Sequence, residues 1–182
     1  MFLFVLNKKA SPEEKELLAK ALQCDLKAVE SVSHLYGVSL YRFLTGVLGD
    51  QEERVRKIMS QSLSLAIREI PLLEKEIPFA LRVMRLLARR LRKDRALGMF
   101  RPGDHSSGKE PRLRILEESW RRISREERIV ILLRDQIFFL YDEIAFIFET
   151  SPDAIKKLLK QARDSFRQAM KAVMTQRKTS RK

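Results

Sequence analysis

The sequence predicts an all-α protein made of two small helical domains joined by a flexible linker. Apolar residues recur at spacings of three and four along the 182-residue chain, without the strict alternation that marks strands. Only 6 glycines and 6 prolines are present, which suits long helices better than a turn-rich β fold. Pro, Gly and Ser concentrate in residues 99–111 (MFRPGDHSSGKEP), and this segment is the expected linker.

Four helices are expected before the linker. Ser11, Pro12 and Glu14 form the pattern of a capping box with proline in the first turn, and a helical run of apolar residues follows them. The other three helices are expected at residues 25–48, at residues 52–70, and from Pro78 to about residue 97.

Four more helices are expected after the linker, followed by a basic tail at residues 175–182. They lie near residues 115–122, after a cap formed by Ser124 with Glu127, near residues 141–148, and at residues 152–174. Only three residues join the last two, and Ser151 can cap the final helix ahead of Pro152. Helices joined by so short a turn must cross steeply, which predicts a helix-turn-helix.

The final helix carries two stripes about 130° apart on a helix that turns by about 100° per residue. An inward-facing apolar stripe beside a row of cations is the layout that a recognition helix needs in a major groove. The alternative is an ordinary amphipathic helix with a solvated lysine face. The apolar stripe comprises Ile155, Leu158, Leu159, Ala162, Phe166 and Ala169, and the cationic one Lys156, Lys160, Arg163, Arg167 and Lys171.

The charge of the chain calls for a polyanionic partner. Lys and Arg number 37 against 24 Asp and Glu, which gives a net charge of +13. Nucleic acid is the first expectation, and an anionic membrane surface competes with it. The apolar run at residues 1–6 is too short for a signal peptide, and no run is long enough to cross a bilayer, so we expect a cytoplasmic protein without membrane insertion.

Signatures of catalysis are missing from the sequence. It has no Gly-rich phosphate loop, no Cys/His metal spacing and no Ser-His-acid grouping. We therefore expect no enzymatic activity, no metal and no cofactor. The single cysteine, Cys24, cannot form an internal disulfide and is expected as a buried or half-buried small residue.

Residues 125–170 contain a series of short motifs in a fixed order: Glu127-Arg128, residues 130–134, Tyr141-Asp142-Glu143-Ile144-Ala145, Ser151, Ile155-Lys156, Leu159 and Ala162-Arg163. In these motifs the segment resembles region 4 of bacterial extracytoplasmic-function sigma factors. The resemblance implies binding of the −35 promoter element, with Lys156, Lys157 and Lys160 as groove or phosphate contacts, Arg163 as a backbone contact and Arg167 as a further candidate.

Four residues depart from the region 4 pattern. Phe138 and Glu149 stand where the family usually has glycine, and Leu140 stands where it has serine. Leu158 stands at a position that is often basic in the family. A side chain in left-handed geometry costs roughly 1–2 kcal/mol, so a distorted or lengthened turn is expected. Loss of the serine cap before Tyr141 removes about 1 kcal/mol of local support.

Residues 40–95 resemble region 2 of the same family. The resemblance implies that one helix binds core RNA polymerase through Val55, Lys57, Ile58, Met59 and Gln61. It also implies that the basic helix faces the −10 element through Phe79, Arg82, Arg85, Arg89 and Arg90. Lys57, Leu86 and Arg90 depart from the usual pattern. Phe79 has two interpretations, packing in the core or stacking on an unpaired base, and the basic helix has a membrane-surface alternative.

The resemblance therefore predicts a sigma factor that joins core polymerase, at the β′ clamp and β flap, and reads double-stranded promoter DNA at −10 and −35. An anti-sigma factor is a further candidate partner. The alternatives are a sigma-derived regulator without core engagement and an adaptor that binds polyanions nonspecifically. The expected units are residues 1–34 (N-terminal helical extension), 35–98 (region 2-like), 99–111 (linker), 112–174 (region 4-like helix-turn-helix) and 175–182 (tail).

Overall fold

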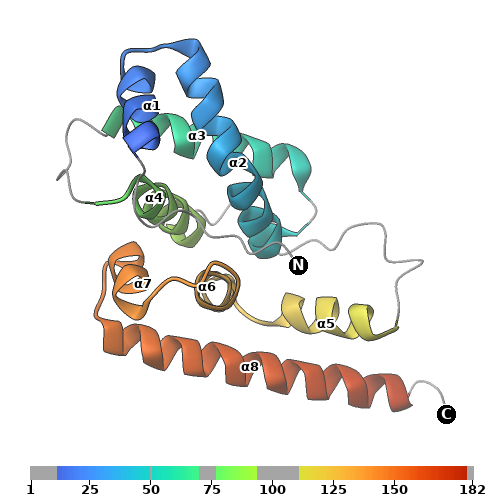
Figure 1. Ribbon diagram of the computed structural model, residues 1–182. Coiled ribbons are helices and arrows are strands. Elements are labelled where there is room, and N and C mark those ends of the chain that lie inside the picture. The colour runs from blue at the N-terminus through green and yellow to red at the C-terminus, as the bar shows by residue number, and fades with distance from the viewer. Residues whose placement is uncertain (1–11, 50, 70–76, 94–110, 180–182) are drawn as a thin grey trace.

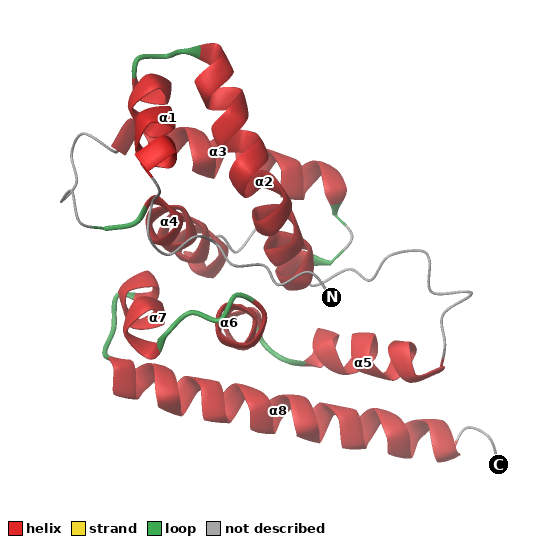
Figure 2. Ribbon diagram, viewed as in Figure 1, coloured by secondary structure: helices red, strands yellow, loops and turns green. Residues whose placement is uncertain are grey.

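The computed structural model describes residues 12–49, 51–69, 77–93 and 111–179. Every regular element in these residues is a helix, which confirms the all-α prediction (Figure 2). The elements are α1 (Pro12–Leu22), α2 (Leu26–Leu48), α3 (Glu52–Glu69), α4 (Phe79–Lys93), α5 (Pro111–Arg122), α6 (Arg125–Ile131), the π-helical turn η4 (Leu132–Gln136), α7 (Tyr141–Phe148) and α8 (Pro152–Thr179).

Helix α2 is bounded by its caps. The Asp25 carboxylate accepts hydrogen bonds from the Lys27 and Ala28 N–H groups, at 2.9 and 3.3 Å, and so satisfies two donors of the first turn. At the other end Gly49, with φ of 79°, donates its N–H to Thr45 O. Between α1 and α2 Cys24 adopts a left-handed φ of 61° and is exposed, so the expectation of a buried thiol is wrong.

The N-terminal helix α1 packs onto α2 through both apolar and polar contacts. Leu18 and Ala21 are buried, and the buried Glu14 accepts a hydrogen bond from the Tyr36 hydroxyl. Burial and the hydrogen bond to Glu14 both raise the pKa of Tyr36. Ser11, the expected partner of Glu14 in a capping box, lies outside the described residues.

The C-terminal half is organised by α8, which runs beneath α5, α6 and α7 along its length (Figure 1). Helix α6 begins at the predicted capping box: the Glu127 N–H donates to Ser124 Oγ and the Ser124 N–H donates to the Glu127 carboxylate. Burial raises the pKa of Glu127, but hydrogen bonds from Ser165 and Ser124 outweigh it, and the pKa is lowered. Helix α8 continues to Thr179, beyond its expected end at residue 174.

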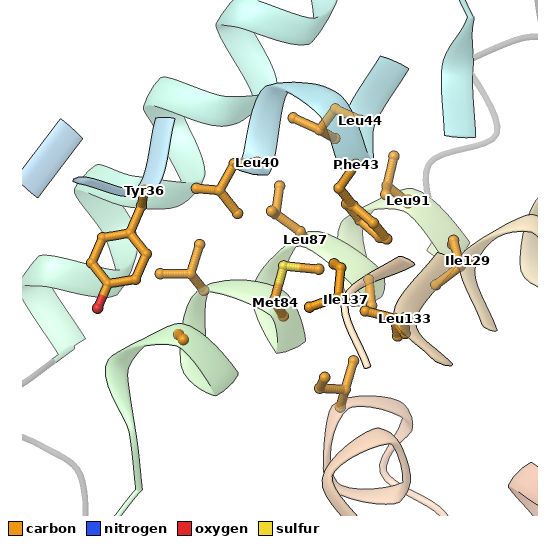
Figure 3. Packing of buried hydrophobic residues seen from close by; sticks show 14 of the residues in the cluster. Tyr36, Leu40, Phe43, Leu44, Met84, Leu87, Leu91, Ile129, Leu133 and Ile137 are labelled. Atoms are coloured by element: carbon orange, nitrogen blue, oxygen red, sulfur yellow. The ribbon is translucent and has the colours of Figure 1, made fainter. Parts of the chain in front are cut away.

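The two halves share one core rather than merely touching. Helix α4 packs against α7 and α6, and the end of α2 packs against α6. The linker expected at residues 99–111 lies outside the described residues up to 110, and the proposed domain boundaries stay a prediction. Figure 3 shows the junction, where residues of both halves interdigitate: Phe43, Leu44, Met84, Leu87 and Leu91 from α2 and α4, and Ile129, Leu133 and Ile137 from the segment after α5.

A helix that crosses a bilayer needs about 20 consecutive, mostly apolar residues. None of the described helices is both long enough and apolar enough to meet this requirement.

Candidate nucleic-acid interface

The first helix of the expected helix-turn-helix starts without the usual side-chain cap. Leu140 occupies the N-cap position with extended backbone but has no side-chain acceptor. Glu143 supplies the other half of a capping box, because its carboxylate accepts the Leu140 N–H at 2.6 Å. Helix α7 therefore keeps its predicted start at Tyr141 despite the leucine.

The turn after α7 keeps the geometry that glycine would favour. Glu149 has φ of 57° and ψ of 47°, which is left-handed. The Thr150 N–H donates to Ala145 O at 3.0 Å and the Glu149 N–H to Phe146 O at 3.3 Å, the paired bonds of a Schellman motif. Phe138 likewise has φ of 64°. The expected lengthening is wrong: both residues accept the strained conformation, and the hydrogen bonds hold the turn.

Helix α8 begins at the predicted cap and turns the predicted side inward. Ser151 Oγ accepts the Ala154 N–H at 3.2 Å. Leu158 and Phe166 are half-buried, and Phe166 meets the Trp120 ring edge-on at 5.4 Å. The buried members of the apolar stripe are Ile155, Leu159, Ala162 and Ala169, joined by Val173.

The α8 residues predicted to contact −35 DNA are all exposed: Lys156, Lys157, Lys160, Arg163 and Arg167. Lys156 pairs with Asp153 at 2.9 Å and lies over the Tyr141 ring at 5.9 Å. Arg167 pairs with Asp164 at 3.1 Å. Within the part of the chain that the structure describes, Lys157 and Lys160 have no ion pair. None of the described residues buries these side chains, so they are accessible to a ligand in this part of the structure.

Arg163 is held in place by the π-helical turn. Its guanidinium pairs with Asp135 of η4 at 2.5 Å. The hydrogen bond to Asp135 raises the pKa of Arg163 against the opposing effect of burial. The π turn ends at Gln136, shortly before α7 begins at Tyr141. It could not be predicted from the sequence, because its residues fit an α-helix equally well.

Two of the five residues predicted for the −10 element are buried in α4. Phe79 is 4% exposed and its ring meets that of Tyr36 edge-on at 5.2 Å. Phe79 therefore packs in the core, and its assignment as a residue that stacks on an unpaired base is wrong. Arg82 is 7% exposed, which removes it from the candidate DNA-facing surface. Arg89 is exposed and Arg90 half-buried, while Arg85 points to the C-terminal half.

Two of the five residues predicted to bind core polymerase are likewise buried. Val55 and Ile58 of α3 are 0% and 2% exposed and pack in the core, so their assignment to a contact surface needs correction. Lys57 and Gln61 are exposed on the same helix, and Met59 is half-buried. The error has a physical cause: apolar spacing identifies the buried stripe, whereas a binding surface lies on the neighbouring face.

Side chains of the C-terminal half cap helices of the N-terminal half, and sequence reasoning missed these contacts. The buried Arg128 donates to Val47 O at the end of α2 and to Trp120 O and Ile123 O before α6, at 3.0, 3.2 and 2.7 Å. The Trp120 indole donates to Gly46 O at 2.7 Å, and Arg125 donates to Leu91 O of α4 at 2.7 Å.

These three side chains satisfy carbonyl groups that a helix end leaves without partners. Burial, with the nearby Arg125 charge, lowers the pKa of Arg128 to about 10 against the opposing effect of Glu127, so the guanidinium stays charged at neutral pH. The sequence offered one weak signal, the Glu127-Arg128 pair of the family pattern, and none for Trp120.

Comparison with known proteins shows the fold. No protein-family model and no curated protein sequence matches the chain. Among solved structures, it is similar to CnrH in complex with the cytosolic domain of CnrY, with a TM-score of 0.64 and 18% identity over 86% of this chain and 96% of that chain. It is also similar to the sigma factor RpoE in complex with the anti-sigma factor NepR from Bartonella quintana, with a TM-score of 0.59 and 15% identity over 78% of this chain and 96% of that one.

Proposed function

We propose that this protein is a divergent sigma factor of the extracytoplasmic-function type, which joins core RNA polymerase in the cytoplasm and directs it to promoters. The observation that carries the proposal is the uncovered cationic face of α8, above all Lys157 and Lys160, on the second helix of a helix-turn-helix. The fold shared with RpoE supports it, as does the net charge of +13. We assign the protein no catalytic activity of its own.

In this proposal α8 reads the −35 element. Its buried stripe fixes the helix on α5, α6 and α7, so that one face is free to enter a major groove. Lys156, Lys157 and Lys160 lie in the first turns, where a recognition helix meets bases and phosphates, and Arg163 and Arg167 follow along the same side. Arg89 on α4 and Lys57 and Gln61 on α3 remain exposed candidates for −10 DNA and core polymerase.

The decisive experiment is transcription with purified core polymerase on fragmented genomic DNA of the source organism, with the start sites mapped by sequencing. The wild-type protein should produce defined start sites. The double variant K157E/K160E should lose them, and its affinity for the selected promoter should fall by at least about tenfold. Because two phosphate contacts disappear, the slope of log K against log salt should become shallower by about 2.

The matched control is K15E/K27E, which makes the same change in charge at exposed lysines of α1 and α2. Helix α1 and the start of α2, which carry these lysines, lie at the opposite side of the molecule from α8 (Figure 1). The control should retain the start sites. If the wild-type protein yields no defined start while it still binds DNA, it is not a sigma factor.

We also propose an anti-sigma factor as a regulatory partner. Both similar structures contain a bound partner, the cytosolic domain of CnrY in one and the anti-sigma factor NepR in the other. Affinity capture with the full-length chain from its own organism, followed by mass spectrometry, should recover such a protein together with polymerase subunits.

The second candidate function is a sigma-derived DNA-binding regulator that no longer engages polymerase. It is favoured by the burial of Phe79 and Arg82 and by the contacts that engage Arg85. Co-purification with the β′ clamp separates the two: retention supports the sigma factor and absence supports the regulator. A salt-steep affinity that is equal for every sequence would instead indicate a nonspecific polyanion binder.

A further inference from the structure

Two carboxylates of the C-terminal half form ion pairs with arginines of α4. The Nε and Nη2 groups of Arg85 both donate to Glu149 Oε1, at 2.9 and 2.7 Å. About two turns further along α4, Arg92 Nε lies 2.9 Å from Glu126 Oε1. A carboxylate oxygen offers an arginine the same charge-assisted acceptor that a DNA phosphate offers.

Aromatic and backbone groups hold the same two guanidinium groups. Arg85 lies over the Phe146 ring at 4.9 Å and Arg92 over the Phe148 ring at 4.8 Å. Arg92 also donates to Phe148 O at 3.1 Å. Both guanidinium groups are therefore held against α6 and α7, while their side chains stay partly exposed to solvent.

A basic cleft opens beside these contacts. It has a volume of about 540 Å³ and lies between α4, α6 and the turn after α7. Arg89, Lys93 and Arg125 line it together with Arg92 and the two carboxylates. Since Arg89 and Lys93 are exposed, an anionic strand can reach the cleft before it displaces either carboxylate.

We propose that Glu126 and Glu149 act as an intramolecular latch that occupies the DNA-facing arginines of α4, and that a nucleic-acid strand entering the cleft must displace these carboxylates. The inference rests on the proposed function and deepens it, because it names the groups that oppose DNA binding by the region 2-like half.

The exposure of the ion pairs makes the latch displaceable. The side chains of Arg85 and Glu149 are 39% and 44% exposed, and those of Arg92 and Glu126 are 36% and 44% exposed. Exposed pairs of this kind are weak and screened by salt, so phosphates at high local density compete with them. Glu149 also has a left-handed backbone, which glycine would adopt without strain. Compared with glycine, the glutamate contributes the carboxylate that pairs with Arg85.

The test measures binding of single-stranded DNA of about 20 nucleotides, the substrate class of a −10-reading surface, by the full chain and by E126Q/E149Q. Release of Arg85 and Arg92 should tighten binding and steepen the slope of log K against log salt by about 1.4, at about 0.7 per contact. The advantage of the variant should therefore shrink about sevenfold between 50 and 200 mM salt. Adding R85Q to the double variant should remove about half of the increase in slope.

The control variant is E16Q/E52Q, which removes two carboxylates that also hold cations, Lys20 and Arg56, at 2.7 and 2.6 Å, but away from α4. If E126Q/E149Q binds no more tightly or steeply than this control, the latch is overturned while the proposed function stands. If neither the wild-type protein nor any variant binds single-stranded DNA at low salt, the latch is overturned, and transcription with core polymerase decides the proposed function separately. Thermal unfolding of each variant verifies that the exposed substitutions leave the fold intact.

Discussion

Among the residues that the structure describes, three other than glycine follow helix ends in the left-handed conformation: Cys24, Phe138 and Glu149, with φ of 61°, 64° and 57°. At Cys24 the Asp25 N–H donates to Lys20 O and the Cys24 N–H to Ala21 O, so the turn has the same Schellman pattern as that at Glu149. The strain of a Cβ in this conformation is compensated by hydrogen bonds that satisfy the last carbonyls of the helix.

Replacement of Cys24 by glycine should therefore stabilise the protein by about 1 kcal/mol, because strain of roughly 1–2 kcal/mol is relieved and part is offset by the greater freedom of glycine in the unfolded chain. Urea unfolding followed by circular dichroism measures the change. The exposed thiol makes no core contact that would be lost. C24S, which keeps the Cβ, should leave the unfolding free energy unchanged; an equal gain in C24S would show that the thiol and not the backbone is responsible.

At the scale of elements, α2 carries two glycines in different surroundings. A Cβ added at Gly37 would meet nothing within 4 Å, whereas one added at Gly46 would lie 2.9 Å from Leu132 Cδ1 of η4. Gly46 thus permits the close approach of the C-terminal half to the end of α2, where its carbonyl accepts the Trp120 indole N–H.

G37A should raise the free energy of unfolding by up to about 1 kcal/mol, the usual difference in helix propensity between alanine and glycine. G46A should fall clearly short of this gain, because Leu132 has to move to admit the new methyl group. Chemical denaturation of the two variants side by side provides the comparison, and equal gains would contradict the proposed close packing.

Arg128 of α6 links three elements, since its guanidinium binds carbonyl groups at the end of α2, in the last turn of α5 and in the turn before α6. R128M keeps much of the side-chain volume but leaves Val47 O, Trp120 O and Ile123 O without this donor. Each buried unsatisfied group costs about 1–3 kcal/mol, so we expect a loss of roughly 3 kcal/mol or more. Equilibrium unfolding measures it; a loss below about 1 kcal/mol would mean that water replaces the guanidinium without penalty.

At the scale of the whole molecule, the carboxylates are set against an excess of cations. Hydrogen bonds lower the pKa of Glu16 (from Lys20), Glu149 (from Arg85) and Asp153 (from Lys156). Groups with a depressed pKa in the folded state stabilise it fully above their unfolded values and lose this contribution as the pH falls through the folded ones.

The free energy of unfolding should therefore be steady near neutral pH and fall as the pH drops from about 5 to 3. Protonation of the 24 carboxylates would also leave 37 Lys and Arg charges unopposed, and their repulsion adds to the loss. Urea denaturation at a series of pH values measures this dependence. Constant stability down to pH 3 would show that the ion pairs do not contribute.

Much of the fold and part of the site followed from the sequence. Capping residues and apolar spacing located the helices, because these signals act within a few residues of the chain: Asp25 starts α2, Ser124 and Glu127 start α6, and Ser151 starts α8. The same local periodicity placed the α8 lysines on an outer face. The resemblance to region 2 failed at Val55, Ile58 and Phe79, because it implied contact surfaces for apolar residues that tertiary packing buries.

The set of helices and the inward and outward sides of α8 can be predicted from local patterns, since both depend on interactions between residues three or four positions apart. How the halves meet is visible in the folded protein alone: Arg128 and Trp120 cap α2, and Glu149 and Glu126 hold arginines of α4. The partners lie far apart in the sequence: Arg92 and Glu126 are separated by 34 positions, and Val47 and Arg128 by 81. No local pattern specifies such pairs, because their approach depends on how the whole apolar core packs.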